Sequence, residues 1–206
     1  MPTRRQTLAT GIAIGVTAAL PAAARDNPMP EELRRLLERD KNPPVLGKAD
    51  GDITLTEFFD YNCGFCRKMA PQIPTLISAE PNLRIAFREW PVFGEGSEFA
   101  ARAALASRQQ NKYWQMHSGL MSMKDRAVEA SVLRVARAVG LDLDRLRADM
   151  DSADVSDHIN HSFLLGDHMS LVGTPTWIAG DEALFGETSI KDLQALIARG
   201  REALAG

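Results

Sequence analysis

The sequence has few of the residues from which metal clusters and nucleic-acid interfaces are built. Its 206 residues include only 2 cysteines, too few for a four-thiolate zinc site or a cubane iron–sulfur cluster. The formal net charge is only −3, whereas phosphate binding requires a basic surface, so we expect no nucleic-acid partner. Internal repeats are also missing, and a composition of 45% hydrophobic and 25% charged residues excludes disordered and collagen-like chains. We expect one domain of moderate size, with or without an insertion.

Long hydrophobic runs are scarce as well. The apolar run at residues 8–20 is shorter than the roughly 20 residues that a transmembrane helix needs. Arg4 and Arg5 precede this run, and small alanines follow it at 22–24. These are the three regions of a secretory signal peptide, so we predict a signal over residues 1–24 with cleavage after Ala24. A buried N-terminal helix is the alternative.

The export route has two candidates. Arg4, Arg5 and Leu8 resemble the twin-arginine signal, but Thr7 stands where a bulky apolar residue is usual, and no lysine follows. Both the twin-arginine and the general secretory route therefore stay open. Either route delivers the chain to an oxidising compartment where disulfides form, so we predict a periplasmic location.

The remaining chain alternates strand and helix patterns. A linker and a short helix are expected over residues 25–44, and the main domain over 45–206. Within it we predict strands at 52–60, 83–89, 176–179 and 183–185, helices at 63–78 and from 189, and a helical block over 97–168. The sequence therefore predicts an α/β fold with an all-helical insertion between the second and third core strands.

The two cysteines are separated by only two residues, in the sequence Cys63-Gly64-Phe65-Cys66, where a predicted strand meets a predicted helix. A thiol in the first turn of a helix faces free backbone N–H groups and the positive end of the helix dipole, which stabilise a thiolate. We therefore expect a lowered pKa at Cys63, which would be the exposed, attacking sulfur. Cys66 lies one turn further along, and we expect it to be buried and to resolve a mixed disulfide.

Other uses of the cysteines and histidines stay open. A half zinc site would need partners, and all four histidines lie beyond residue 116. A structural disulfide would close so small a loop that it would gain little entropy. His158, His161, His168 and Met169 have side chains that suit copper, but solvated or hydrogen-bonded histidines are the favoured interpretation. We predict no metal site, and we expect His117 to be a packing residue.

The cysteine motif also carries a family resemblance. Residues 58–66 (Phe-Phe-Asp-Tyr-Asn-Cys-Gly-Phe-Cys) and the later Gly-Thr-Pro-Thr-Trp at 173–177 resemble the exported DsbA-like branch of the thioredoxin superfamily. Within that branch the chain is similar to the group of ScsC and the catalytic domains of DsbC and DsbG. The motifs Ser-x-x-Ala-Ala at 97–101 and Lys-Tyr-Trp-x-x-His at 112–117 resemble the same branch. The resemblance implies a thioredoxin fold over roughly residues 45–200.

The resemblance implies roles for two residues near the cysteines, Glu57 and Pro71. Glu57, six residues before Cys63, matches a buried acid whose pKa should be raised and which could exchange protons with Cys66. The alternative is an ordinary surface residue on a strand. Pro71, five residues after Cys66, matches a proline that kinks the first helix, unless that helix ends there.

The resemblance also implies a substrate-binding position. Pro175 matches a cis-proline that lies opposite the active-site disulfide, and an ordinary trans-proline is the alternative. In the matching fold it turns the backbone of Thr174 outward, so that an extended substrate pairs with it as an added strand.

Together these features predict a periplasmic protein thiol–disulfide oxidoreductase with a redox-active Cys63–Cys66 pair and no bound cofactor. Its partners would be exported proteins with thiols or disulfides, and a membrane redox partner, either a quinone-coupled oxidase or an electron-delivering reductase. Because only residues 25–44 precede the fold, where related isomerases carry an oligomerisation segment, we favour an oxidase or general oxidoreductase. The alternatives are an isomerase or reductase, and a copper-binding or chaperone-like module.

Overall fold

A five-stranded sheet of order β1-β3-β2-β4-β5 forms the centre of the computed structural model, which describes residues 29–205. The two central strands are parallel to each other, and every other neighbouring pair is antiparallel. The predicted signal peptide at 1–24 lies outside the described residues. The strands are β1 (Val45–Gly47), β2 (Ile53–Phe59), β3 (Leu83–Glu89), β4 (Thr176–Ala179) and β5 (Glu182–Phe185).

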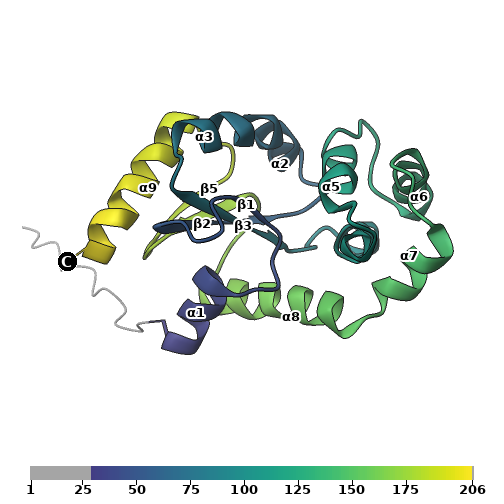
Figure 1. The fold of residues 1–206 in the computed structure, drawn as a ribbon, viewed down its shortest axis with the longest axis horizontal. Helices are drawn as coiled ribbons and strands as arrows, with labels where there is room; N and C mark the ends of the chain where they lie inside the picture. Colours follow the sequence, from purple (N-terminus) through teal and green to yellow (C-terminus); the bar gives the residue numbers. More distant parts are fainter. Residues whose placement is uncertain (1–28, 206) are drawn as a thin grey trace, which may run out of the picture.

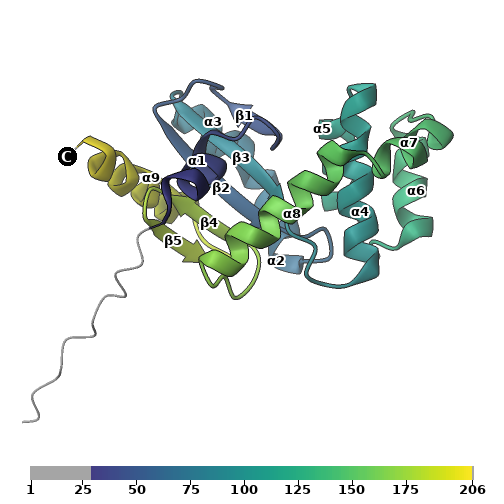
Figure 2. The same cartoon turned by 90° about the horizontal axis from the view of Figure 1, so that it is seen from below.

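Helices cover both faces of this sheet, and a helical block lies at one end of it (Figures 1 and 2). The predicted helical insertion is confirmed as the segment from α4 to α8, between β3 and β4. The helices are α1 (Glu31–Arg39), α2 (Gly64–Met69), α3 (Ile73–Ala79), α4 (Glu95–Ala106), α5 (Tyr113–Met121), α6 (Glu129–Ala138), α7 (Leu143–Met150), α8 (Ala153–His168) and α9 (Ile190–Ala205), with short 3-10 helices η1 (Ala70–Gln72) and η2 (Ser107–Gln110).

The central strands β2 and β3 are buried along their whole length. Successive side chains of a strand point to opposite faces of the sheet, so each of these strands contributes to two cores. Leu55, Phe59 and Ile85 belong to the larger core, which continues into the helical insertion and α9. Phe58 belongs to a smaller core on the other face, where Leu37 of α1 packs. Burial on both faces agrees with the β-branched and aromatic sequence of β2, whereas β3 also buries the charged residues Arg84, Arg88 and Glu89.

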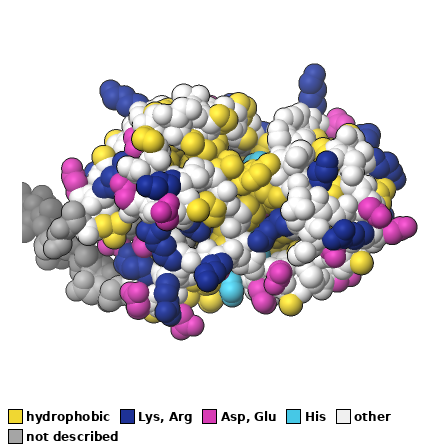
Figure 3. All heavy atoms as spheres, viewed as in Figure 1, with side chains coloured by type: hydrophobic (Ala, Val, Ile, Leu, Met, Phe, Trp, Pro, Cys, Tyr) yellow, Lys and Arg dark blue, Asp and Glu magenta, His cyan; other side chains and the backbone are white. Residues whose placement is uncertain are grey.

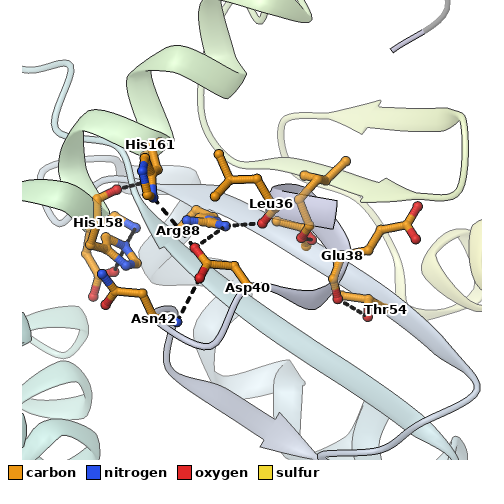
Figure 4. A network of polar contacts seen from close by, with 12 residues as sticks. Leu36, Glu38, Asp40, Asn42, Thr54, Arg88, His158 and His161 are labelled. Atoms are coloured by element: carbon orange, nitrogen blue, oxygen red, sulfur yellow. Dashed lines mark hydrogen bonds and ion pairs between the residues drawn. The ribbon is translucent and has the colours of Figure 1, made fainter. Parts of the chain in front are cut away.

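The C-terminal end of α1 is fixed to its own sheet by side chains from β2 and β3 (Figure 4). The last carbonyls of a helix have no partner within the helix. Here Thr54, Thr56, Arg84 and Arg88 donate to the carbonyl oxygens of the last turn of α1, and Arg88 also pairs with Asp40 at 3.1 Å. The predicted N-terminal helix is therefore an integral part of the domain.

Two details differ from the sequence expectation. The short strand β1 was not predicted, because three residues are too few to show an alternating pattern. The helix expected at 63–78 is interrupted, since the 3-10 turn η1 that contains Pro71 separates α2 from α3. Within residues 29–205, none of the helices has the length and apolar character needed to cross a membrane.

Candidate functional site

The cysteine pair lies at the carboxyl end of β2, where the chain turns into α2. Cys63 is the N-cap of α2, and its Sγ accepts a hydrogen bond from the backbone N–H of Cys66 at 3.2 Å. Both cysteines are free thiols in this structure. Cys66 is fully buried, as expected, but Cys63 is only 3% exposed. The expectation of an exposed Cys63 was therefore wrong, because a distant segment, which the local sequence does not reveal, packs against it.

That distant segment contains the Thr174–Pro175 peptide bond, which is cis. The Sγ of Cys63 lies 3.2 Å from the carbonyl oxygen of Thr174 and, as a thiol, donates to it. The carbonyl oxygen of Pro175 accepts from the N–H of Gly186 at 2.7 Å, which ties this loop to the end of β5. Thr174, one of the two substrate-binding residues predicted from the sequence, is thus in contact with the first cysteine, and Pro175 follows it directly.

The pKa values of the two thiols are shifted in opposite directions. The Cys66 thiol has the largest effect and lowers the pKa of Cys63. The side chain of Thr174 and backbone N–H groups near the sulfur lower it further, to about 6, against the opposing effect of burial. Burial raises the pKa of the Cys66 thiol far above its ordinary value, and the negative charges of Cys63 and Glu57 add to this shift. At neutral pH the pair therefore holds one thiolate, on Cys63.

Glu57 is a buried acid on β2, only 3% exposed. Burial raises its pKa well above the ordinary value, with further contributions from the charges of Cys63 and Glu89. Its strand position pairs with Trp177 on one side and Phe87 on the other, in the middle of the sheet. The alternative of a surface position is excluded. Burial in this position favours the protonated acid, which can donate a proton, and the carboxylate that it leaves can take a proton back.

A polar cluster before the motif was missed by the sequence reasoning. The Asp60 carboxylate accepts from Asn62 N–H at 2.6 Å, from Ser97 Oγ at 2.7 Å and from Phe93 N–H at 3.1 Å. Asn62 in turn bonds the backbone of Ala127. The only signal in the sequence was the position of these polar residues beside the cysteines and in the motif at 97–101.

A second buried polar cluster joins β3 to the helical insertion. Glu89 accepts from Tyr113 at 2.5 Å, and its other oxygen lies 2.8 Å from His158 Nε2. The Nδ1 of His117 lies 3.0 Å from the Tyr61 hydroxyl, and burial lowers the pKa of His117 to about 4, so it is neutral. Both His117 and His158 are buried, which fits packing roles.

Two of the histidines considered as copper ligands lie against carboxylates in the described part of the chain. His158 is held by Glu89 in the core, whereas His161 lies 3.7 Å from Asp40. Among residues 29–205 no group of three His, Cys, Asp or Glu side chains is placed to hold a metal ion.

A cavity of about 410 Å³ lies between the α2–α3 segment and α5. Figure 3 shows hydrophobic side chains in this hollow, between the sheet and the helical insertion. Its lining includes Phe87, Trp114 and Met121, with Arg67 as the charged member of the set. Neither cysteine lines it, so this cavity is separate from the cysteine pair.

The fold and the site geometry agree with a known family. A family model described as the DSBA-like thioredoxin domain matches residues 54–198, which is most of the chain. The chain belongs to this family. Membership in the DSBA-like family agrees with the enzyme class expected from the sequence, protein thiol–disulfide oxidoreductase.

Solved structures support this assignment. A thioredoxin-like oxidoreductase from Silicibacter pomeroyi is 46% identical, with a TM-score of 0.79 and coverage of 82% of this chain and 98% of that chain. The thiol–disulfide exchange protein alpha-DsbA2 from Wolbachia pipientis is 27% identical, with a TM-score of 0.74 and coverage of 82% and 91%. The catalytic domain of Proteus mirabilis ScsC shares the fold at 21% identity, with a TM-score of 0.73 and coverage of 83% and 96%.

Some curated relatives are much longer proteins. The Na(+)/H(+) antiporter NhaA 3 of Salinispora tropica is 28% identical over 155 residues, which is 74% of this chain and 24% of that relative. The chain thus spans about a quarter of the length of this relative, and the likeness concerns that quarter alone.

Proposed function

We propose that this DSBA-like protein exchanges disulfides with exported proteins through Cys63 and Cys66. The observation that supports the proposal is the position of Cys63 Sγ between the N–H of Cys66 and the carbonyl oxygen of Thr174. The pKa of this thiol, lowered to about 6, agrees with it. A thiolate is both the attacking group and the favoured leaving group in disulfide exchange. Cys63 therefore forms the mixed disulfide in either direction, and in the reducing direction Cys66 resolves it.

In the oxidising direction the pair begins as a disulfide. A substrate thiolate attacks Cys63 Sγ, the bond between Cys63 and Cys66 breaks, and the electron pair leaves on Cys66. The second substrate thiolate then attacks the substrate's own sulfur in the mixed disulfide and releases Cys63 as a thiolate. Two electrons pass from the two substrate thiols to the cysteine pair, and the substrate gains one disulfide.

Glu57 supplies the proton that Cys66 needs. Cys66 leaves as a thiolate in a buried position, where the charged form is strongly disfavoured. A nearby neutral acid removes this charge by donating its proton, and in the reverse direction its carboxylate takes the proton back. The buried position and raised pKa of Glu57 suit both steps.

The surroundings of the pair suit an unfolded protein substrate. Large apolar side chains are exposed on segments next to the motif: Phe65 is 52% exposed and Val172 is 86% exposed. Phe93, Val128 and Phe185 are also about half exposed, on segments whose backbone N–H groups bond residues around the pair. A backbone contact through Thr174 would serve substrates of any sequence, and these apolar side chains would favour chains that have not yet buried their own.

The direction that we propose is oxidation. The described helix α1 packs on its own sheet, so residues 31–39 do not form a free oligomerisation stalk. A thiolate pKa of about 6 lies between those of thioredoxin (about 7) and DsbA (about 3.5), so we expect an intermediate redox potential. The predicted signal at residues 1–24 supports a periplasmic location, and a membrane partner would reoxidise the pair.

The test uses the mature protein with two substrates. Oxidised protein is mixed with a reduced, unfolded ribonuclease, and reduced protein with a ribonuclease whose disulfides are scrambled. We expect faster gain of disulfides with the first substrate than recovery of activity with the second, and no reaction by Cys63→Ala. Preference for the scrambled substrate would instead support the isomerase alternative. A potential at or below about −270 mV, that of thioredoxin, would contradict oxidation.

A further inference from the structure

Asn62, immediately before the first cysteine, reaches across to the helical insertion. Its side-chain Nδ2 donates to the carbonyl oxygen of Ala127 at 3.1 Å and to Ser97 Oγ at 3.0 Å. Its Oδ1 accepts from the N–H of Ala127 at 2.8 Å. A side-chain amide that pairs with both backbone groups of one residue fixes its own position as well as that of the partner. The backbone on the N-terminal side of Cys63 is thereby tied to the loop before α6.

Arg67, immediately after the second cysteine, reaches the same loop. Its Nη1 donates to the carbonyl oxygens of Met123 and Asp125, both at 2.9 Å. Its Nε donates to the carbonyl oxygen of Tyr61 at 2.8 Å, on the other side of the motif. The planar guanidinium therefore joins both ends of the redox motif to residues 123–125, in a geometry that a lysine cannot reproduce.

We propose that Asn62 and Arg67 are positioning residues that tie the redox motif to residues 123–127, so that the helical insertion holds Cys63 in its place for exchange. The inference deepens the proposed function and rests on it. In this loop Asn62 and Arg67 contact backbone atoms only. The position of the motif therefore depends on the conformation of the loop and not on the identity of its side chains. The neighbouring Lys68 has no such role, because it is exposed and pairs with Glu187 at 3.1 Å.

The loop is itself held in place from the insertion side. The Oγ of Ser131, in the first turn of α6, donates to the carbonyl oxygen of Arg126 at 2.8 Å and accepts from the N–H of Val128 at 3.0 Å. Removing this hydroxyl loosens the loop without touching the redox motif. Ser131→Ala therefore tests whether the insertion acts on Cys63 through the loop.

The experiment titrates the Cys63 thiolate by its absorbance near 240 nm in the reduced, mature protein. The variants are Asn62→Ala, Arg67→Lys, Arg67→Gln and Ser131→Ala. We expect each to raise the pKa of Cys63 by about half a unit or more, because a looser motif aligns its N–H donors less well. Each should also lower the redox potential measured against glutathione, since a less stable thiolate makes the reduced state less favourable.

Arg102→Lys is the matched control. Arg102 also donates to a backbone carbonyl of the insertion, that of Met150 at 3.3 Å, but it does not contact the motif. We expect its titration to match that of the unmodified protein, whatever its melting temperature. If Arg67→Lys titrates like the unmodified protein while Arg67→Gln shifts, Arg67 acts only through its charge and the proposal is wrong.

The proposal is also wrong if the variants lower the melting temperature and leave the pKa of Cys63 unchanged, which is the behaviour of purely structural contacts. Because the titration needs no substrate, its outcome is separate from that of the exchange assay. A protein that fails to oxidise ribonuclease would overturn the proposed function and still show whether the loop positions Cys63.

Discussion

The Sγ of Cys63 and the carbonyl oxygen of Thr174 lie 3.2 Å apart, although the two residues are 111 positions apart in the chain. The carbonyl can accept a hydrogen bond from a thiol but offers nothing to a thiolate. The Oγ1 of the same threonine is buried and has no hydrogen-bond partner among the described residues. Its hydroxyl is therefore available to donate to the thiolate, so that one residue serves both protonation states of Cys63.

Replacing Thr174 by valine should remove this donor. We expect Thr174→Val to raise the pKa of Cys63 from about 6 by roughly 0.5–1 unit, because a thiolate that loses a hydrogen bond is less stable. Thr174→Ser keeps the hydroxyl and should titrate like the unmodified protein. The measurement is again thiolate absorbance against pH, and equal values for valine and serine would show that the hydroxyl has no such role.

The lowered pKa of Cys63 should also make the stability of the reduced protein depend on pH. Its pKa falls from 9.0 to about 6 on folding, so its contribution is complete above pH 9 and is lost as the pH falls through 6. Between pH 5 and 8 the free energy of unfolding should rise by on the order of 2 kcal/mol more in the reduced protein than in Cys63→Ser. Urea denaturation at both pH values measures this difference, and parallel pH profiles for the two proteins would contradict it.

Glu57→Gln should have opposite effects on two quantities: it should raise the free energy of unfolding at pH 8 and lower the rate of disulfide exchange. The raised pKa of Glu57 means that its favourable contribution is complete below pH 4.5 and is lost as the pH rises towards its folded-state value. The glutamine variant should therefore be more stable than the unmodified protein at pH 8, with little difference at pH 4. Without the acid, the resolving step at Cys66 should slow by at least about tenfold.

Stopped-flow exchange with a model peptide and urea denaturation at both pH values test the two parts of this prediction. A matched change is Thr56→Val on the same strand, which removes a hydroxyl that bonds Leu37 and not the redox pair. It should lower stability and leave the exchange rate unchanged. Unaltered exchange in Glu57→Gln would remove Glu57 from the mechanism.

The local sequence was sufficient for the parts of the site that depend on neighbouring residues. A strand that runs into a helix places Cys63 at the N-cap and Cys66 one turn later, and both positions follow from spacing alone. The helical insertion could also be predicted, because its apolar stripes recur at helical intervals. The strand β1 could not, since its three residues are specified by pairing with β3 and not by any pattern of their own.

The contacts that complete the site depend on residues far apart in the chain. Asn62 bonds Ser97 and Ala127, which are 35 and 65 residues away, and nothing in local propensity or periodicity specifies such pairs. The burial of Cys63 depends likewise on the segment around Thr174. The sequence could indicate that Asn62 is polar and that Pro175 matches a cis-proline, but it could not indicate which residues they contact.

The buried cluster around Glu89 should be important for stability. Tyr113 donates to Glu89 at 2.5 Å in a site where both side chains are buried. Tyr113→Phe leaves that carboxylate short of a donor, so we expect a loss of about 1–3 kcal/mol in the free energy of unfolding. Tyr61→Phe, which removes the bond with the neutral His117, should cost less, about 0.5–1.5 kcal/mol. Equal losses in the two variants would show that the carboxylate does not depend on Tyr113.

The exposed apolar side chains beside the pair should affect protein substrates and not small thiols. Val172 is 86% exposed, so Val172→Ser removes apolar surface at little cost to folding. We expect kcat/KM for a reduced, unfolded protein to fall about three- to tenfold, because that substrate loses an apolar contact worth about 1 kcal/mol. The rate with glutathione should stay the same, since a small thiol meets only the sulfur. A control at Leu164, which is 49% exposed on α8, should change neither rate, and an equal loss with both substrates would mean that Val172 shapes the redox pair itself.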